Sequence, residues 1–337
     1  MVKWLMLLGC CTLAGAQESR RVLLAPVDFK KGDHEVTLTG IHQIESDGSR
    51  LYLRSNRDLE IFILTPDGRC VGKIGGKGDH PSQFGYQGIL AMAVRGSELW
   101  ALDQGIQRLR YFVDGDYIDS FPLGEGNYNL LARLPTSNVF AFSRDRLVIP
   151  THPIRGYLAA VKGFDGTLIQ HVGELLSFPQ KLMDRIPAMN DTLWLRHGQG
   201  WISIHKFFPL VVRYDEDFKP THHFEIKSEA VDLLAKEVME FEPKPGLALP
   251  RTVFSDAKLF RGDLYLMSLG RLHRVDLETG EVKSVVSFYG EGADFAKTTQ
   301  PNVTLFFFAF LDDGQLFVAH PAMLWNHDFW TVPGLGP

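Results

Sequence analysis

The stretch from Leu51 to Phe112 contains one complete structural repeat and the opening of the next. It reads LYLRSN at 51–56, IFILTPDGRCVGKIGGKGDHPSQF at 61–84 and ILAMAVRGSELWALDQGIQRLRYF at 89–112. The apolar runs have the length of β-strands, and Asp67-Gly68 between two of them is a strong hairpin signal. A glycine-rich loop follows, and then the phrase starts again. We therefore expect the rest of the chain to hold further copies of this unit.

A turn that contains Gly or Asp, followed by an apolar pair, recurs six times along the chain. The steps between copies are 48, 48, 54, 63 and 52 residues. Each apolar pair begins a strand. One further strand precedes it and two follow it, the second of which leads into the next loop. Four strands per copy fit the blade of a propeller. The sequence predicts an all-β fold, a six-bladed β-propeller of four-stranded antiparallel blades. The apolar pairs begin at Leu51, Leu99, Leu147, Trp201, Leu264 and Leu316.

Two further features concern the ends and the connections of this predicted ring. The sixth blade lacks an outer strand after 329–332, and we expect an N-terminal strand, Glu35–Thr39 or Val22–Val27, to complete the blade and cover its open edge. Apolar residues of Ser228–Glu242 recur at helical spacing, which predicts a helix inserted between blades. Leu175–Ile186 is a candidate for a second, shorter helical insertion.

The N-terminal residues 1–16 have the three parts of a secretory signal peptide. Lys3 precedes an apolar run, and Ala14-Gly15-Ala16 forms a small-residue cleavage site. Cleavage there would leave residues 17–337 as a single propeller domain outside the cytoplasm, periplasmic or secreted. The alternative is a lipoprotein anchored through Cys10, because residues 7–10 resemble a lipobox. Cys70 would then be the only cysteine within the propeller, and we expect it to be a small buried hydrophobe.

Composition excludes some classes of partner. The formal net charge is −5, so nothing indicates the basic face that nucleic-acid binding requires. No apolar run is long enough to span a bilayer. The loops that join the blades carry Tyr and Arg, residue types enriched at interfaces, and we expect this face to meet a protein, a peptide or a glycan.

The segments Val71–Phe84 (VGKIGGKGDHPSQF) and Leu99–Phe112 (LWALDQGIQRLRYF) resemble the signature of NHL-type six-bladed propellers. The likeness is to exported bacterial proteins described as the six-bladed β-propeller family. It implies the propeller fold and an extracytoplasmic setting, and it implies no established activity. The third to sixth copies lack the full glycine-rich loop, so the likeness there rests on spacing.

A column of polar residues lies four positions after the start of each apolar pair. These positions come at the ends of the second strands, on the face where successive blades are joined, so their side chains could converge on a ligand. Ser, Asp and Thr at strand ends also commonly bond to the next turn. The six residues of this column are Ser55, Asp103, Thr151, His205, Ser268 and His320, and His152, beside Thr151, lies near the same rim. All seven are candidate ligand-binding residues.

Two classes of function fit these observations. The first is an exported binding or scaffold propeller without a cofactor. The second is a metal-assisted lyase or hydrolase, lactonase-like, in which His152, His205 and His320 hold a divalent metal. The two differ in geometry, because the second requires the three imidazoles to converge on the axis. The sequence contains no nucleophile elbow, and its glycine-rich loop precedes no helix, which excludes a P-loop.

Overall fold

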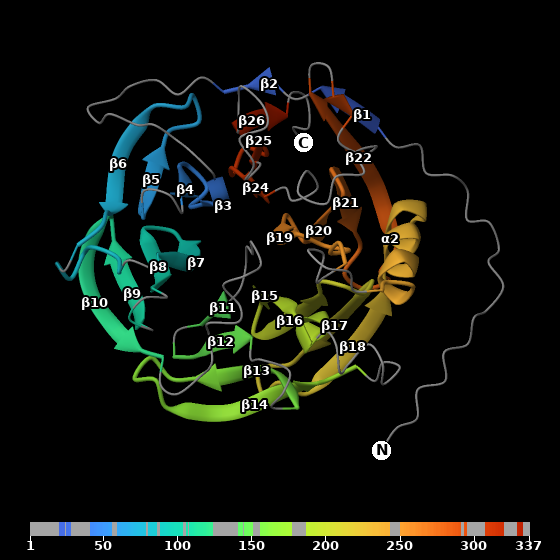
Figure 1. Cartoon of the computed structure of the whole chain (residues 1–337), viewed down its shortest axis with the longest axis horizontal. Helices are drawn as coiled ribbons and strands as arrows, with labels where there is room; N and C mark the ends of the chain where they lie inside the picture. Colours follow the sequence, from blue (N-terminus) through green and yellow to red (C-terminus); the bar gives the residue numbers. More distant parts are fainter. Residues whose placement is uncertain are drawn as a thin grey trace.

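The computed structural model describes residues 20–23, 25–27, 41–55, 59–78, 80–85, 88–103, 106, 108–123, 141–143, 145–150, 156–176, 187–242, 250–290, 293–294, 307–319 and 329–332. Their strands form six sheets arranged in a ring around a central axis (Figure 1). The predicted six-bladed β-propeller with four-stranded antiparallel blades is therefore confirmed. The predicted signal peptide, with Cys10, lies outside the described residues. No helix among the described residues is long and apolar enough to cross a membrane.

The blades follow one another in chain order, and each blade runs from its innermost to its outermost strand. Blade 1 contains β3 (Ile41–Ser46), β4 (Leu51–Ser55), β5 (Glu60–Leu64) and β6 (Cys70–Gly75). Blade 2 contains β7 (Ile89–Arg95), β8 (Glu98–Asp103), β9 (Arg108–Val113) and β10 (Asp116–Pro122). Blade 3 contains β11 (Ala141–Phe142), β12 (Leu147–Pro150), β13 (Tyr157–Lys162) and β14 (Leu168–Glu174).

The second half of the ring repeats this pattern with additions at its edges. Blade 4 contains β15 (Thr192–His197), β16 (Gly200–His205), β17 (Leu210–Tyr214) and β18 (Pro220–Glu225). Blade 5 contains β19 (Asp256–Phe260), β20 (Asp263–Ser268), β21 (Arg271–Val275) and β22 (Val282–Gly290), and β23 (Ala293–Asp294) pairs with β22. Blade 6 contains β24 (Phe307–Phe310), β25 (Leu316–Ala319), β26 (Phe329–Val332) and β2 (Ala25–Pro26).

The N-terminal segment closes the ring, as expected from the missing outer strand. Ala25 and Pro26 pair antiparallel with β26 at Thr331 and Trp330, so the alternative Val22–Val27 supplies the closing strand. The other candidate, Glu35–Thr39, lies outside the described residues. Just before this point β1 (Arg20–Leu23) pairs parallel with β22 of blade 5, a pairing that the repeat pattern did not predict. The N-terminal segment thus covers the outer edges of two blades, which removes exposed strand edges.

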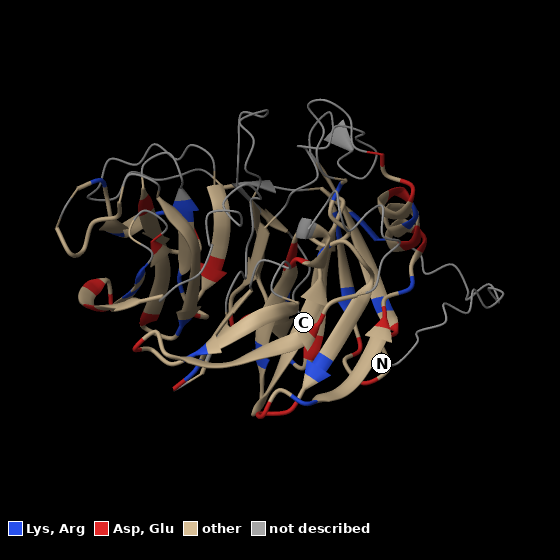
Figure 2. Ribbon diagram, turned by 60° about the horizontal axis from the view of Figure 1, so that its bottom comes forward, with Lys and Arg blue, Asp and Glu red and all other residues tan. Residues whose placement is uncertain are grey.

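Acidic hairpin turns join the strands within each blade at one face of the ring, here called the hairpin face. In the turn between β9 and β10, Asp114 and Gly115 both have positive φ angles, 51° and 91°. Two such residues make the turn whose twist matches the flanking strands, which is why Asp-Gly predicts hairpins. In Figure 2 many of the charged residues lie at these turns, along the lower edge of the molecule. The opposite face, where blades are connected, is called the loop face.

The hydrophobic core lies between neighbouring blades, and each of the six seams has its own cluster of buried side chains. Phe307 and Phe308, adjacent on β24, are fully buried and enter the clusters on opposite sides of blade 6. Cys70 is buried as expected and belongs to the seam between blades 6 and 1. Sheets packed face to face around a ring need apolar residues on both sides of their inner strands, so the sequence there shows runs rather than strict alternation.

The glycine-rich loop after β6 folds back into the seam between blades 1 and 2. Phe84 is fully buried there, and its amide donates to the carbonyl of Gly76 at 2.9 Å. Gly75 has a φ of 95°, and a side chain at this position would collide with the Phe84 ring. The loop glycines are therefore structural, in agreement with the rejection of a phosphate-binding loop.

Helix α2 (Glu229–Met239) lies within the predicted insertion 228–242 and follows the outermost strand of blade 4 (Figure 1). Val231, Leu234 and Val238 are buried in the seam between blades 4 and 5. Ser228 caps the helix, because its hydroxyl accepts from the amide of Val231 at 3.3 Å. The predicted helix at 175–186 falls mostly outside the described residues, and a 3-10 turn follows at Pro187–Asn190.

Replacing Ser228 by alanine is expected to lower the free energy of unfolding by about 1–2 kcal/mol, because it removes a helix cap. The hydroxyl also lies 3.1 Å from Nε2 of the buried His273, so the substitution also removes a contact between α2 and blade 5. Urea unfolding followed by circular dichroism measures the loss. Ser228→Thr keeps the hydroxyl and should retain most of the stability; an equal loss in both variants would show that the cap is not the cause.

Candidate functional site

The predicted polar column lies where the register places the ends of the second strands, on the loop face. Ser55 pairs with Ile41, Asp103 with Ile89 and His205 with Thr192, so these ends lie beside the starts of the innermost strands. Ser55 is described in its backbone only. Thr151, His152 and His320 lie outside the described residues. Of the predicted site residues, the structure therefore describes the side chains of Asp103, His205 and Ser268.

Asp103 is fully buried and binds the neighbouring loop. Its Oδ2 accepts from Nε of Arg110 at 2.9 Å and from the amide of Gly85 at 3.1 Å. Arg110 in turn donates to the carbonyl of Pro81 and lies over the Phe84 ring, 5.5 Å from its centroid. This carboxylate holds the loop after blade 1 against blade 2. It therefore bonds to a neighbouring loop, as polar residues at strand ends commonly do.

His205 and Ser268 are buried at corresponding positions of blades 4 and 5. His205 is 1% exposed and Ser268 is fully buried. Neither Nδ1 of His205 nor Oγ of Ser268 has a hydrogen-bond partner among the described residues. Burial lowers the pKa of His205 to about 4, so its imidazole is neutral at physiological pH. Buried polar atoms without partners are rare in folded proteins and call for an explanation.

A buried ion pair lies directly beside His205. Lys206 is 2% exposed, and its Nζ lies 3.9 Å from Oδ2 of Asp191. Burial lowers the pKa of Lys206, and the nearby carboxylate opposes that shift. The backbone of Lys206 also joins two neighbouring segments of the chain. Its amide donates to the carbonyl of Asp191, and its carbonyl accepts from the amides of Val253 and Phe254. The sequence analysis did not select Lys206, because it is a single lysine after an apolar strand.

The described part of the chain contains no group of three or more His, Cys, Asp or Glu side chains that could hold a metal ion. Of the three histidines proposed as ligands, only His205 belongs to that part. Its neutral imidazole has the protonation state that a metal ligand requires. Whether the other two approach it stays a prediction.

The stability of the protein is expected to fall as the pH drops from about 6.5 to about 4, because buried histidines are protonated in the unfolded chain first. The pKa of His205 is about 4 when folded, against 6.5 as its ordinary value, so stability is complete above 6.5 and declines below it. The contribution of His205 to this decline is about 3 kcal/mol. His273, whose pKa burial also lowers to about 4, adds to it over the same range. Urea midpoints measured across this range for His205→Gln should depend less on pH; an unchanged slope would contradict this origin.

A second ion pair lies near the axis of the ring and joins two of its innermost strands. Nζ of Lys258 on β19 lies 2.5 Å from Oε1 of Glu45 on β3, and the two side chains are 13% and 12% exposed. Gln43 also donates to Glu45 at 2.8 Å, and Lys258 lies 3.8 Å from Asp256. Because β3 belongs to blade 1 and β19 to blade 5, this pair bridges blades that are not neighbours. The polar groups near the axis thus bind one another.

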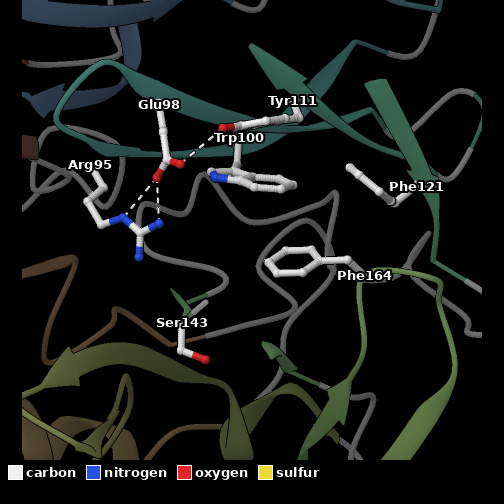
Figure 3. A pocket seen from close by; sticks show the side chains of 7 residues that line it. All are labelled: Arg95, Glu98, Trp100, Tyr111, Phe121, Ser143 and Phe164. Atoms are coloured by element: carbon white, nitrogen blue, oxygen red, sulfur yellow. Dashed lines mark hydrogen bonds and ion pairs between the residues drawn. The ribbon is translucent and has the colours of Figure 1, made fainter. Parts of the chain in front are cut away.

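A pocket opens at the hairpin face between blades 2 and 3, where the sequence analysis placed no site (Figure 3). Its volume is about 750 Å³. Aromatic rings line one side: Trp100, Tyr111, Phe121 and Phe164. The other side carries Arg95, Glu98 and Ser143. No sequence signal indicates this pocket, because Phe164 and Ser143 come from the next blade and line it only once blades 2 and 3 have packed together.

Comparison with known proteins shows the fold. No family model matches the chain, and no curated protein matches its sequence. A Bacteroides fragilis protein described as exported has a TM-score of 0.55 at 14% identity, over 90% of this chain and 88% of that one. Streptogramin B lyase has 0.52 at 10%, over 92% and 96%, and a Bacteroides vulgatus protein has 0.51 at 9%, over 94% and 96%. These identities are too low to carry an activity across.

Proposed function

We propose that the protein is an extracytoplasmic binding propeller whose loop face holds a ligand at a polar centre. One observation carries this proposal. His205 Nδ1 and Ser268 Oγ lie at equivalent strand ends of neighbouring blades, buried, and without hydrogen-bond partners among the described residues. Each unmet buried group costs about 1–3 kcal/mol. A polar ligand on the loop face, bonded directly or through a water molecule, would supply the missing partners.

The proposed centre comprises the seven residues of the predicted column and its rim. Within it Asp103 acts by positioning, since its carboxylate holds the neighbouring loop. The ligand is a protein, a peptide or a glycan, in keeping with the hydroxyl and imidazole groups of the centre, whose one carboxylate, Asp103, is paired with Arg110. The extracytoplasmic setting rests on the signal-like residues 1–16, with attachment through Cys10 as the alternative, and the exported description of the Bacteroides fragilis neighbour agrees with it.

Binding to peptide and glycan arrays tests this proposal. The purified protein is compared with His205→Ala and Ser268→Ala, and with His222→Ala as a matched control, because His222 is exposed on the outermost strand of blade 4. We expect the two central variants to lose binding while the control keeps it, with melting temperatures recorded for all. A ligand that binds all four proteins equally would place recognition elsewhere and refute the central site.

A metal-assisted lyase or hydrolase is the second candidate. The observation that favours it is the neutral imidazole of His205, whose Nδ1 has no partner among the described residues. His152 and His320 would complete the ligand set, and the metal would supply an activated water. Streptogramin B lyase, a propeller of similar fold, is an enzyme by its name. Elemental analysis of protein purified without chelators decides: a stoichiometric metal that is lost in His205→Ala supports the enzyme, and metal-free protein refutes it.

A further inference from the structure

We propose that the pocket between blades 2 and 3 is a second binding site and that it takes the ring of a neutral saccharide. The pocket lies on the hairpin face, opposite the proposed central site, and its volume of about 750 Å³ falls in the range of small-molecule sites. It has an aromatic wall and a polar wall (Figure 3). A pyranose ring could contact both walls, because its C–H face is apolar and its edge carries hydroxyls.

The aromatic wall is held in place before any ligand arrives. Trp100 lies between Tyr111 and Phe164, with ring centroids 4.1 and 4.6 Å apart and interplanar angles of 21°. Phe121 lies 5.8 Å from both Trp100 and Phe164. Rings that pack on one another in this way have little freedom left to lose, so a ligand that covers them incurs little ordering cost. Trp100 is covered on both faces and is 6% exposed, so the half-buried rings of Tyr111, Phe121 and Phe164 form the preorganised apolar surface that a ligand would contact.

The polar wall carries equal and opposite charges. Arg95 donates from Nε and Nη2 to Oε2 of Glu98, at 2.9 and 2.5 Å, and the Tyr111 hydroxyl donates to Oε1 at 3.0 Å. Because the two charges cancel, the wall favours neither an anion nor a cation. A carboxylate has about four acceptor positions, and these contacts use three, so Glu98 can still accept a ligand hydroxyl. The side chains of Arg95 and Glu98 are 51% and 30% exposed, within reach of a ligand.

The corresponding seam between blades 5 and 6 carries different side chains at the positions that line the pocket. In the strand register Phe260 occupies the position of Arg95, and Tyr265 that of Trp100. There the ring of Phe310 from blade 6 packs on both, with centroids 4.5 Å from that of Phe260 and 4.7 Å from that of Tyr265. In blade 5, Phe260 stacks on Phe310 across the seam. In blade 2, Arg95 instead bonds to Glu98 of the same blade.

The carboxylates at the two seams differ in the same way. Asp263, at the position of Glu98, is bonded by two cations, Arg274 at 2.6 Å and Lys283 at 2.7 Å, and is 5% exposed. Glu98 has one cation and one hydroxyl and remains accessible. The blade 5 carboxylate is thus satisfied within the fold. The carboxylate of Glu98 is left at the mouth of a pocket.

Saturation-transfer NMR with maltose, cellobiose and N,N′-diacetylchitobiose tests this inference on the purified protein. Phe164→Ala removes half of the aromatic sandwich. The matched control is Phe218→Ala, which removes an aromatic ring from the equivalent turn of blade 4, where Phe218 stacks on Trp201 at 5.0 Å. We expect wild type and Phe218→Ala to bind at least one disaccharide, and Phe164→Ala to bind it roughly tenfold more weakly. Thermal unfolding of both variants confirms that they are folded.

Two results would overturn the inference. Wild-type protein that gives no signal with any of these saccharides shows that the pocket does not take a neutral sugar ring. A signal that survives unchanged in Phe164→Ala places saccharide binding elsewhere. N-acetyl-phenylalaninamide serves as a further probe: if this aromatic amide binds and the saccharides do not, the pocket accepts a peptide side chain. None of these results bears on the proposed central site, which lies on the other face.

Discussion

Replacing Lys258 by methionine is expected to lower the free energy of unfolding by about 3 kcal/mol, the lower end of what breaking a buried ion pair costs, because the pair is largely shielded from water and its partner charge would lose its compensation. Glu45 would lose the ammonium group at 2.5 Å, and the fully buried Asp256 would lose the same group at 3.8 Å. Urea unfolding at neutral pH measures the loss.

Two comparisons test the cause of this loss. Lys73→Met breaks an ion pair with Glu60 that is longer, 3.4 Å, and more exposed, and it should cost less than about 1 kcal/mol. The double variant Glu45→Gln, Lys258→Met should recover part of the stability, since no unpaired charge from the bridge remains. Equal losses at the two lysines, or no recovery in the double variant, would contradict the proposed role of the axial pair.

Replacing Asp103 by alanine is expected to cost about 3–5 kcal/mol of stability for a related reason. The buried guanidinium of Arg110 would lose its carboxylate, and the amide of Gly85 would lose its acceptor. The loop after blade 1 would then be held by fewer contacts. Unfolding midpoints measure the effect, and faster proteolysis within 76–88 would locate it.

Asp103→Asn is the informative control for this prediction. The amide oxygen can still accept from Gly85 and Arg110, so the loss should be smaller than that of Asp103→Ala, with only the charge removed. If Asp103→Ala kept its full stability and lost ligand binding alone, Asp103 would be a direct ligand residue rather than a positioning residue.

The fold could be predicted from the sequence because each blade is a local unit. Asp-Gly turns, apolar runs of strand length and the step of about 50 residues are all set by residues close in the chain. The helix at Glu229–Met239 could be predicted from local signals too, since Ser228 precedes apolar residues at helical spacing. The parallel pairing of β1 with β22 could not be predicted, because it joins segments from the two ends of the chain.

The candidate site could be predicted only in its positions. Counting along each repeat located the strand ends on the loop face, since the register of an antiparallel sheet repeats from blade to blade. What each side chain does there depends on its neighbours. Asp103 is bonded to Arg110, whereas His205 has an unpartnered nitrogen, and nothing in their spacing distinguishes them.

The sequence by itself determined the number of blades and the order of their strands, and it located Ser55, Asp103, His205 and Ser268 at the ends of second strands. Only the tertiary structure decided which groups meet across the ring: Glu45 and Lys258 are 213 residues apart, and Phe164 reaches Trp100 across a seam. The physical reason is that local propensities act within a few residues, whereas these contacts form only when different blades pack together. The axial ion pair requires the closed ring, and the blade 2–3 pocket requires the packing of two consecutive blades.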